Sequence, residues 1–410
     1  MHLLCLSNGH GEDTIAVRIL QAVQQQPQPP QVAALPIVGA GYAYTQCDIP
    51  LIGPVKALPS GGFIYMDGRQ LARDVQGGLV QLTWAQLQAV RSWRQQKDDA
   101  LILAVGDIVP LLFAWLSGVP YAFVGTAKSE YYLRDEHDWL ARQSWWADRL
   151  ERWTRCIYHP WERWLLSRPL CQAVFPRDAL TTTILQQFGV PAIALGNPMM
   201  DGLAWEAGPQ LPTIGVTVTL IPGSRLPEAY ANWELILQTV PGLLAALGRP
   251  LTLLAAIAPG LARDRLKQAA LTAQWQSTST TTFIIGTGSA TATLELMPPE
   301  RYAECLQRGD VAIAMAGTAT EQFVGLGKPA IALVGLGPQF TAAFAEAQTR
   351  LLGPSVIVIE SPSQVGSVVQ KLLNDPARRQ AIMANGQHRM GSPGAAQRIA
   401  AHLMQQVHFL

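Results

Sequence analysis

The sequence has few charged residues and few cysteines. Charged residues make up 14% of its 410 residues, and Lys+Arg at 30 nearly balance Asp+Glu at 29. With a net charge of +1 the chain has no global basic field for a nucleic acid, so nucleic acid is not an expected partner and any polyanion site is local. The five cysteines are scattered and form no C-x-x-C pair, a pattern typical of buried thiols in a reducing compartment.

A long uninterrupted apolar run is also missing. Residues 1–6 are apolar but short, without a basic lead, which favours a first strand over a signal peptide. The longest apolar tract, residues 100–125, is interrupted by Asp107, Pro110 and Pro120. Because a charge at the bilayer centre costs about 3 kcal/mol, we predict strand, helix and strand in this tract. We expect a cytoplasmic protein, soluble or peripheral on a membrane.

Strand and helix patterns alternate twice along the chain, with a linker at residues 206–212. The length exceeds one ordinary core, so we expect two doubly wound α/β domains facing each other across a cleft. The predicted domains are 1–205 and 213–375, followed by C-terminal helices at 376–410 that pack back across the domain junction. Within them we predict a loop at 7–13, one helix at 227–247, a second parallel sheet, and surface insertions flanking a short apolar run at 275–293.

The first strand leads into a glycine loop with three titratable side chains. Gly9 and Gly11 allow a ligand to approach the backbone, and His10, Glu12 and Asp13 follow the strand's carboxyl end. The loop is no dinucleotide fingerprint, because Thr14 occupies the third glycine position. A local backbone bond for His10 and a helix-start role for the two acids explain the same residues without function.

Two further strand ends carry polar groups. Asp107 follows the strand at 101–105, either as a helix cap or as a catalytic or ligand-orienting carboxylate. The apolar strand at 311–316 runs into Gly317, and the helix that follows offers hydroxyls from Thr318 and Thr320 and a carboxylate from Glu321. This turn is suited to a nucleotide, although an ordinary helix start has the same composition.

Six of the twelve tryptophans lie between Trp139 and Trp164, among five arginines. Tryptophan and arginine together are typical of a membrane interface, while the seven-residue spacing of Trp139, Trp146 and Trp153 also fits a core stripe. On the first interpretation the membrane contacts are Trp145, Trp146, Arg149, Arg152 and Trp153.

Three segments resemble motifs of lipid-A-disaccharide synthases. They are residues 220–225 (LIPGSR), 196–201 (GNPMMD) and 317–321 (GTATE), and the resemblance spans residues 100–352. More distantly, residues 9–11 and 338–341 look like segments of lipid-linked N-acetylglucosaminyltransferases and galactolipid synthases. The chain most resembles the synthase-related proteins of cyanobacteria and plastid lineages.

The resemblance implies the GT-B fold, with a nucleotide-sugar donor in the C-terminal domain and a lipid or lipid-linked acceptor in the N-terminal one. UDP-sugar is the favoured donor substrate. With no Asp-x-Asp motif in the sequence we expect neither a divalent ion nor another cofactor. The general base is His10 first, Asp107 second and Glu12 third. The implied donor contacts are Gly223, Ser224 and Arg225 at the diphosphate, Gly317, Thr318 and Thr320 at the phosphates or nearby sugar, Glu321 at the ribose and Gln339 at the transferred sugar.

Two alternatives remain open at this point. A nucleotide-sugar 2-epimerase shares the two-domain fold and needs no acceptor lipid. A non-catalytic protein that binds a nucleotide sugar or a lipid would not hydrolyse the donor. A homodimer is compatible with each of the three.

Overall fold

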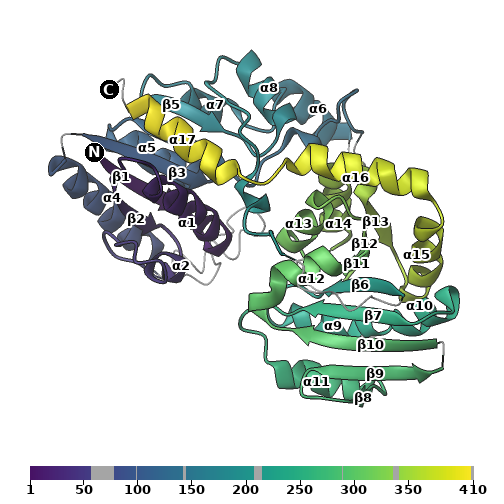
Figure 1. Cartoon of the computed structure of the whole chain (residues 1–410). Helices are drawn as coiled ribbons and strands as arrows, with labels where there is room; N and C mark the ends of the chain where they lie inside the picture. The colour runs from purple at the N-terminus through teal and green to yellow at the C-terminus, as the bar shows by residue number, and fades with distance from the viewer. Residues whose placement is uncertain are drawn as a thin grey trace. The chain divides into compact units, whose positions relative to one another are not determined.

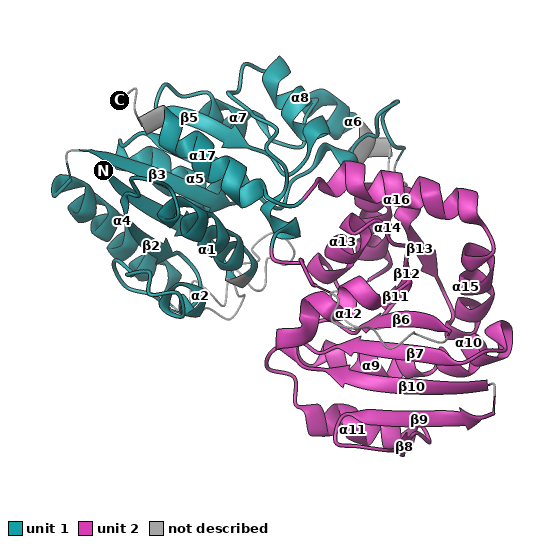
Figure 2. Cartoon of the chain, viewed as in Figure 1, with its two compact units in different colours: residues 1–201, 393–410 teal, residues 202–392 magenta. Residues whose placement is uncertain are grey.

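The computed structural model describes residues 1–56, 78–97, 99–141, 145–206, 215–288, 290–335 and 341–407, without the side chains of residues 10, 145–148, 150 and 406–407. The chain divides into two compact units (Figure 2). Unit 1 comprises residues 1–201 and 393–410, and unit 2 comprises residues 202–392. Each unit has its own sheet, as expected from the two runs of alternating strands and helices.

Unit 1 contains a five-stranded parallel sheet in the order β2-β1-β3-β4-β5. Its strands consist almost entirely of apolar residues without alternation, because helices cover both faces of a parallel sheet. The strands are β1 (His2–Ser7), β2 (Gln31–Pro36), β3 (Ala100–Gly106), β4 (Tyr121–Gly125) and β5 (Cys171–Phe175). The helices are α1 (His10–Gln24), α2 (Tyr42–Thr45), α4 (Leu79–Gln95), α5 (Ile108–Ser117), α6 (Trp145–Thr154), α7 (Pro160–Leu166), α8 (Ala179–Gln187) and α17 (Ala395–Val407).

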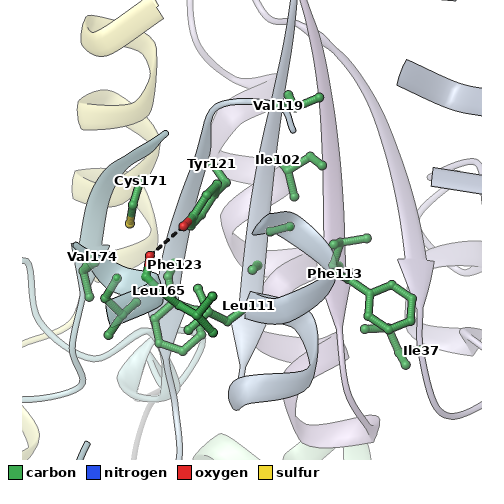
Figure 3. Packing of buried hydrophobic residues seen from close by; sticks show 14 of the residues in the cluster. Ile37, Ile102, Leu111, Phe113, Val119, Tyr121, Phe123, Leu165, Cys171 and Val174 are labelled. Carbon is green, nitrogen blue, oxygen red and sulfur yellow. Dashed lines mark hydrogen bonds between the residues drawn. The ribbon is translucent and has the colours of Figure 1, made fainter. Parts of the chain in front are cut away.

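Alternate residues of these strands point to opposite faces of the sheet. Leu4, Leu6 and Ile102 pack in one buried cluster with side chains from α4, α5 and α7. Figure 3 shows this cluster around Phe123, with the Tyr121 hydroxyl donating to the Leu165 carbonyl at 2.6 Å. Helices α1 and α17 contact each other along their lengths (Figure 1).

Asp201 fixes α17 to unit 1, although α17 follows unit 2 in the sequence. Its carboxylate accepts hydrogen bonds from the backbone N–H groups of Gly394 at 2.5 Å, Ala395 at 3.2 Å and Ala396 at 2.7 Å. These are the free donors of the first turn of α17, and a carboxylate is also favoured there by the helix dipole. Asp201 ends the 196–201 segment, so in this structure it serves as a long-range helix cap.

Unit 2 contains an eight-stranded sheet in the order β13-β12-β11-β6-β7-β10-β9-β8. Its strands are β6 (Val216–Ile221), β7 (Leu251–Ala256), β8 (Gln276–Ser277), β9 (Thr282–Thr287), β10 (Ala290–Met297), β11 (Val311–Ala314), β12 (Ala330–Leu333) and β13 (Val356–Ile359). Its helices are α9 (Glu228–Leu237), α10 (Val240–Leu247), α11 (Arg263–Thr272), α12 (Tyr302–Arg308), α13 (Thr318–Gly325), α14 (Ala342–Leu352), α15 (Val365–Leu373) and α16 (Pro376–Met390).

The prediction for residues 275–293 was wrong, and so was that of a wholly parallel second sheet. The segment forms β8, β9 and the start of β10, with β9 antiparallel to β10 and β10 parallel to β7. Along β10, Ala292, Leu294 and Leu296 are buried and alternate with less buried residues. The threonines between them are β-branched and favour strands, and they conceal the apolar half of the alternation.

Two other element predictions also need correction. The predicted helix at 227–247 is two helices, α9 and α10, because Pro241 in the first turn of α10 has no N–H to continue the earlier helix. The predicted loop at 7–13 is shorter, since α1 already begins at His10. The strand, helix and strand predicted between residues 100 and 125 are confirmed as β3, α5 and β4. None of the described helices is long and apolar enough to cross a membrane.

Candidate functional site

The first group of candidate residues lies where β1 meets α1. Gly9 has φ of +126°, a conformation that glycine adopts without strain. Gly9 is the N-cap residue of α1 and has no side chain to cap the helix, and Glu12 and Asp13 lie in its first turn. At Gly11 a side chain would meet open space among the described residues. Gly11 is exposed and Gly9 is buried, and the ligand-binding role of this loop stays a prediction.

Asn8 and Asp107 join the carboxyl ends of the neighbouring strands β1 and β3. The Asn8 amide donates to Asp107 Oδ2 at 3.0 Å, and the backbone N–H of Val109 donates to Asp107 Oδ1 at 2.9 Å. Asp107 thus caps α5, as one interpretation predicted, and also contacts the β1 loop, while its catalytic or ligand-orienting role stays a prediction. Asn8 is buried, and within the described residues its Oδ1 atom has no hydrogen-bond partner.

Glu12 lies against the same two strand ends. Its Cγ is 3.1 Å from the point where a Cβ on Gly106 would lie, so a larger residue at 106 would displace it. The Thr126 hydroxyl, after β4, donates to Glu12 Oε1 at 3.4 Å. Burial, with a smaller contribution from the nearby charges of Asp107 and Asp13, raises the pKa of Glu12 to about 7. Burial likewise raises the pKa of Asp107, opposed by its bonds from Val109 and Asn8.

Asp13 is separate from this cluster and is structural. Its Oδ1 accepts a hydrogen bond from the Ser7 hydroxyl at 2.5 Å, and Ser7 lies 2.6 Å from the Tyr44 hydroxyl. All three side chains are buried, and burial raises the pKa of Asp13 to about 6. The network connects β1, α1 and α2 and stabilises the glycine loop between β1 and α1. The side chain of His10 lies outside the description, so its role stays a prediction.

The corresponding edge of unit 2 is built from two turns that follow the paired strands β6 and β11. Gly223 has φ of +93°, and a Cβ there would lie 3.0 Å from the Met315 carbonyl oxygen. Asn232 of α9 donates to the carbonyl of Pro222 at 3.0 Å and more weakly to that of Met315 at 3.5 Å. The two turns are therefore held together, and a side chain at position 223 would have to push them slightly apart.

The second of these turns leads into α13. Its N-cap residue is Gly317, which has no side chain to cap the helix. The Ala316 carbonyl accepts hydrogen bonds from the hydroxyl of Thr320 at 2.6 Å and from the amide of Gln348 at 2.8 Å. Thr320 is fully buried and Thr318 is exposed, so Thr318 has the accessible hydroxyl of the pair. Glu321, which follows Thr320, is only 9% exposed.

Ser224 and Arg225 lie in the β6 turn and are exposed. Gln339 falls outside the described residues, so its predicted contact with the transferred sugar stays untested.

Four residues that shape the two edges were not predicted from the sequence. They are Asn8, Thr126, Asn232 and Gln348. Only Asn232 gave a usable signal, because it is a polar residue on the apolar side of a helix, where a buried amide needs a partner.

The tryptophan and arginine tract divides between two helices. Trp153 of α6 is 74% exposed, so the core-stripe alternative is wrong at this position. Arg149 and Arg152 of the same helix are exposed too, while the side chains of Trp145 and Trp146 lie outside the description. Trp139 packs beneath the Arg134 guanidinium, 3.9 Å from the ring centroid. The tract therefore includes exposed and packed tryptophans.

No protein-family model matches the chain, and no curated protein matches its sequence. Solved structures do match over its whole length. The calicheamicin glycosyltransferase CalG4 aligns with a TM-score of 0.62 at 14% identity, covering 99% of this chain and 98% of that one. The UDP-GlcNAc 2-epimerase of Neisseria meningitidis, bound to UDP-GlcNAc, aligns at 0.57 and 14%, covering 99% and 100%. The fold is GT-B.

Acinetobacter baumannii MurG also aligns, with a TM-score of 0.54 at 15% identity, covering 98% of this chain and 99% of that one. Glycosyltransferases and epimerases thus stand together among the similar structures, and a likeness at this level of identity establishes the fold alone. The predicted fold class is confirmed. The likeness to lipid-A-disaccharide synthases rests on the three sequence segments.

Proposed function

We propose that the chain is a glycosyltransferase that moves a sugar from a nucleoside-diphosphate sugar, with UDP-sugar favoured, to a lipid or lipid-linked acceptor. The observation that carries this proposal is the paired turns of unit 2, which hold Gly223 against the Met315 carbonyl beside the glycine N-cap of α13. Backbone N–H groups at a helix start and an adjacent glycine turn suit a diphosphate. The GT-B fold provides the architecture.

In this proposal unit 2 binds the donor. Arg225 supplies a fixed positive charge beside the diphosphate, Thr318 a hydroxyl, and Glu321 a carboxylate for the ribose. As the bond between the anomeric carbon and the diphosphate oxygen breaks, the electron pair moves to that oxygen. Loss of one contact to such developing charge costs about 3 kcal/mol of transition-state stabilisation. Because negative charge develops on the leaving nucleotide, we expect the loss of Arg225 to reduce transition-state stabilisation more than the loss of Thr318 or Glu321.

Unit 1 supplies the proton acceptor. The acceptor hydroxyl oxygen attacks the anomeric carbon and its proton passes to a base. Glu12 suits this role because burial raises its pKa to about 7, close to the pH at which it would work. The Asn8 and Asp107 pair lies beside it and joins the loop before α1 to the end of β3. His10 precedes it by two residues and is the competing base.

The proposal is tested first at the donor site. Arg225→Ala and Glu321→Ala should each weaken UDP or UDP-sugar binding, measured by titration calorimetry, by about tenfold or more, because each removes a charge-assisted contact. Arg249→Ala is the matched control, since Arg249 is an exposed arginine of the same unit outside both turns. Unchanged affinity in both site variants would remove the nucleotide site from unit 2 and the proposed function with it.

A nucleotide-sugar 2-epimerase is the second candidate, favoured by the full-length likeness to the Neisseria meningitidis enzyme. Both reactions need a bound nucleotide sugar and groups that move protons. They differ in product. Incubation with UDP-sugar alone, followed by NMR of the sugar ring, separates them, because an epimerase changes the configuration at C2 without an acceptor and a transferase does not.

A further inference from the structure

The outer surfaces of α4, α5 and α7 carry an unusual share of exposed apolar side chains. Ten large hydrophobic residues are exposed in the described part of the chain, and six of them lie on these three helices of unit 1. We refer to the six as the α4–α5–α7 patch. They are Val80, Trp84, Leu112, Leu116, Trp161 and Trp164, which range from 38% to 63% exposed.

The three helices that carry the patch are neighbours. α5 contacts both α4 and α7, and the rings of Trp115 and Trp164 meet edge to face at 5.4 Å. Within α4 the pair Val80 and Trp84 is four residues apart, as are Leu112 and Leu116 within α5, so each pair lies on one helix face. The sides of α4 and α5 that face the sheet are apolar as well, and these two helices are therefore apolar on two sides.

The charges on this surface have one sign. Neither α4 nor α5 contains an acidic residue, and the single acid of α7, Glu162, is 2% exposed and paired with Lys128 at 2.6 Å. Exposed cations are present: Arg91 and Arg94 lie on α4. After α7, Arg168 places its guanidinium 4.2 Å from the centroid of the Trp164 ring. The patch thus combines tryptophan, aliphatic and arginine side chains without an opposing exposed carboxylate on its own helices.

We propose that the α4–α5–α7 patch docks unit 1 on an anionic lipid surface. Tryptophan and aliphatic side chains enter the interface between headgroups and acyl chains, and arginines pair with anionic headgroups. A second copy of the chain fits less well, because a two-fold contact through this surface would bring the arginines of both copies together. The surface lies on α4, α5 and α7, whereas the contacts predicted from the sequence lie on α6.

The inference gives the proposed lipid acceptor a surface for approach, yet it is tested without donor, acceptor or catalysis. Its failure and that of the proposed function are therefore distinguishable. The assay is sedimentation of the full chain with phosphatidylcholine vesicles, with and without phosphatidylglycerol, at low and high salt. We expect binding only to the vesicles that contain phosphatidylglycerol, weakening as salt rises.

Two double variants test the surface. Arg91→Gln with Arg94→Gln should weaken vesicle binding about thirtyfold, because each arginine near an anionic surface contributes about a fivefold factor. Trp84→Gln with Leu112→Gln should weaken it about tenfold or more by removing apolar area. Arg378→Gln with Arg379→Gln, on the exposed face of α16, removes the same charge from unit 2 and should leave binding unchanged. Circular dichroism confirms that each variant is folded.

Four outcomes would overturn the proposal. The wild-type chain fails to bind vesicles with phosphatidylglycerol at low salt. The α16 variant weakens binding as much as the α4 variant, which would indicate net charge alone. Trp153→Gln abolishes binding while the α4 and α5 variants bind normally, which would assign the contact to α6. Sedimentation equilibrium reveals a dimer that Trp84→Gln with Leu112→Gln dissociates, without vesicle binding, which would assign the patch to a second copy.

Discussion

The carboxyl edges of the two sheets have the same architecture and different chemistry. In unit 1 the edge carries Glu12 and Asp107, carboxyl groups whose pKa values are raised by burial. In unit 2 the corresponding turns carry Gly223, Thr318 and the glycine N-cap of α13. Acids with raised pKa values can hold and release a proton near neutral pH, whereas glycine turns and helix starts provide fixed donors for an anion.

This difference indicates how one fold can divide a group transfer between two similar units. The unit that binds a diphosphate needs charge that does not change with pH, and a guanidinium such as Arg225 meets that need. The unit that removes a proton needs a group that changes charge near neutral pH, which Glu12 does. The predictions below test whether the division is real, from the largest expected effect to the smallest.

Glu12→Gln should lower the transfer rate by about a hundred- to ten-thousandfold while UDP affinity stays within about threefold, because the amide cannot accept the proton. In the wild-type chain kcat should rise with pH through about 7, since the base acts when it is ionised. The pH profile of kcat, measured with a saturating UDP-sugar donor, tests both statements. Comparable loss of UDP affinity would place Glu12 in the donor site instead.

His10→Ala is the companion experiment, because His10 is the first base predicted from the sequence. If Glu12 is the base, this variant keeps the rise in kcat near pH 7 with a reduced plateau. If His10 is the base, the variant loses the rise, and Glu12→Gln retains it. The two pH profiles therefore decide between two residues in the first turn of α1.

The fold and the positions of several strand ends could be predicted from the sequence. Buried parallel strands are continuous apolar runs, so β1, β3, β6 and β11 were all located from composition. Strand β10 was missed because its threonines resemble a polar surface segment. Asn8 could not be found either, since its role depends on which strands pair, and the residue that accepts its hydrogen bond lies 99 positions away in sequence.

A second prediction concerns pH and stability in unit 1. The pKa of Glu12 is about 7 in the folded chain, against 4.5 for the free group. Between these values the unfolded chain loses its proton first, so stability falls as pH rises from 4.5 to 7 and the loss is complete above 7. At 1.36 kcal/mol per pKa unit the upper limit is about 3 kcal/mol. Glu12→Gln should therefore be the more stable protein at alkaline pH.

Urea unfolding of the wild type and Glu12→Gln across this pH range tests the sign. The free energy of unfolding of the variant should exceed that of the wild type above neutral pH, and the difference should shrink toward acid pH. Glu360→Gln is the control, because Glu360 is an exposed acid of unit 2. A Glu12→Gln variant that is less stable at alkaline pH would mean that the carboxylate makes a favourable interaction when ionised.

A third prediction contrasts how the two units use the C-terminal helices. Asp201→Ala removes three hydrogen bonds from the first turn of α17 and should destabilise unit 1 by about 2 kcal/mol. Amide hydrogen exchange should quicken in residues 395–407. Asp375→Ala, which removes the exposed cap bond of 2.9 Å to Arg378 N–H in α16, should cost about half as much and act within unit 2. Equal exchange effects in both units would contradict the assignment of α17 to unit 1.

The smallest expected effect comes from two glycine variants in unit 2. They separate the cost of a left-handed backbone from the effect of the close contact between the β6 and β11 turns. Gly223 has φ of +93° with its missing Cβ 3.0 Å from the Met315 carbonyl, while Gly260 has φ of +88° with nothing within 4 Å. Alanine at either position should cost about 1 kcal/mol of stability for the left-handed backbone. Only Gly223→Ala should also weaken UDP binding, because its methyl group separates the β6 turn from the β11 turn. Equal UDP affinity in both variants would mean that the close approach of these turns has no part in the nucleotide site.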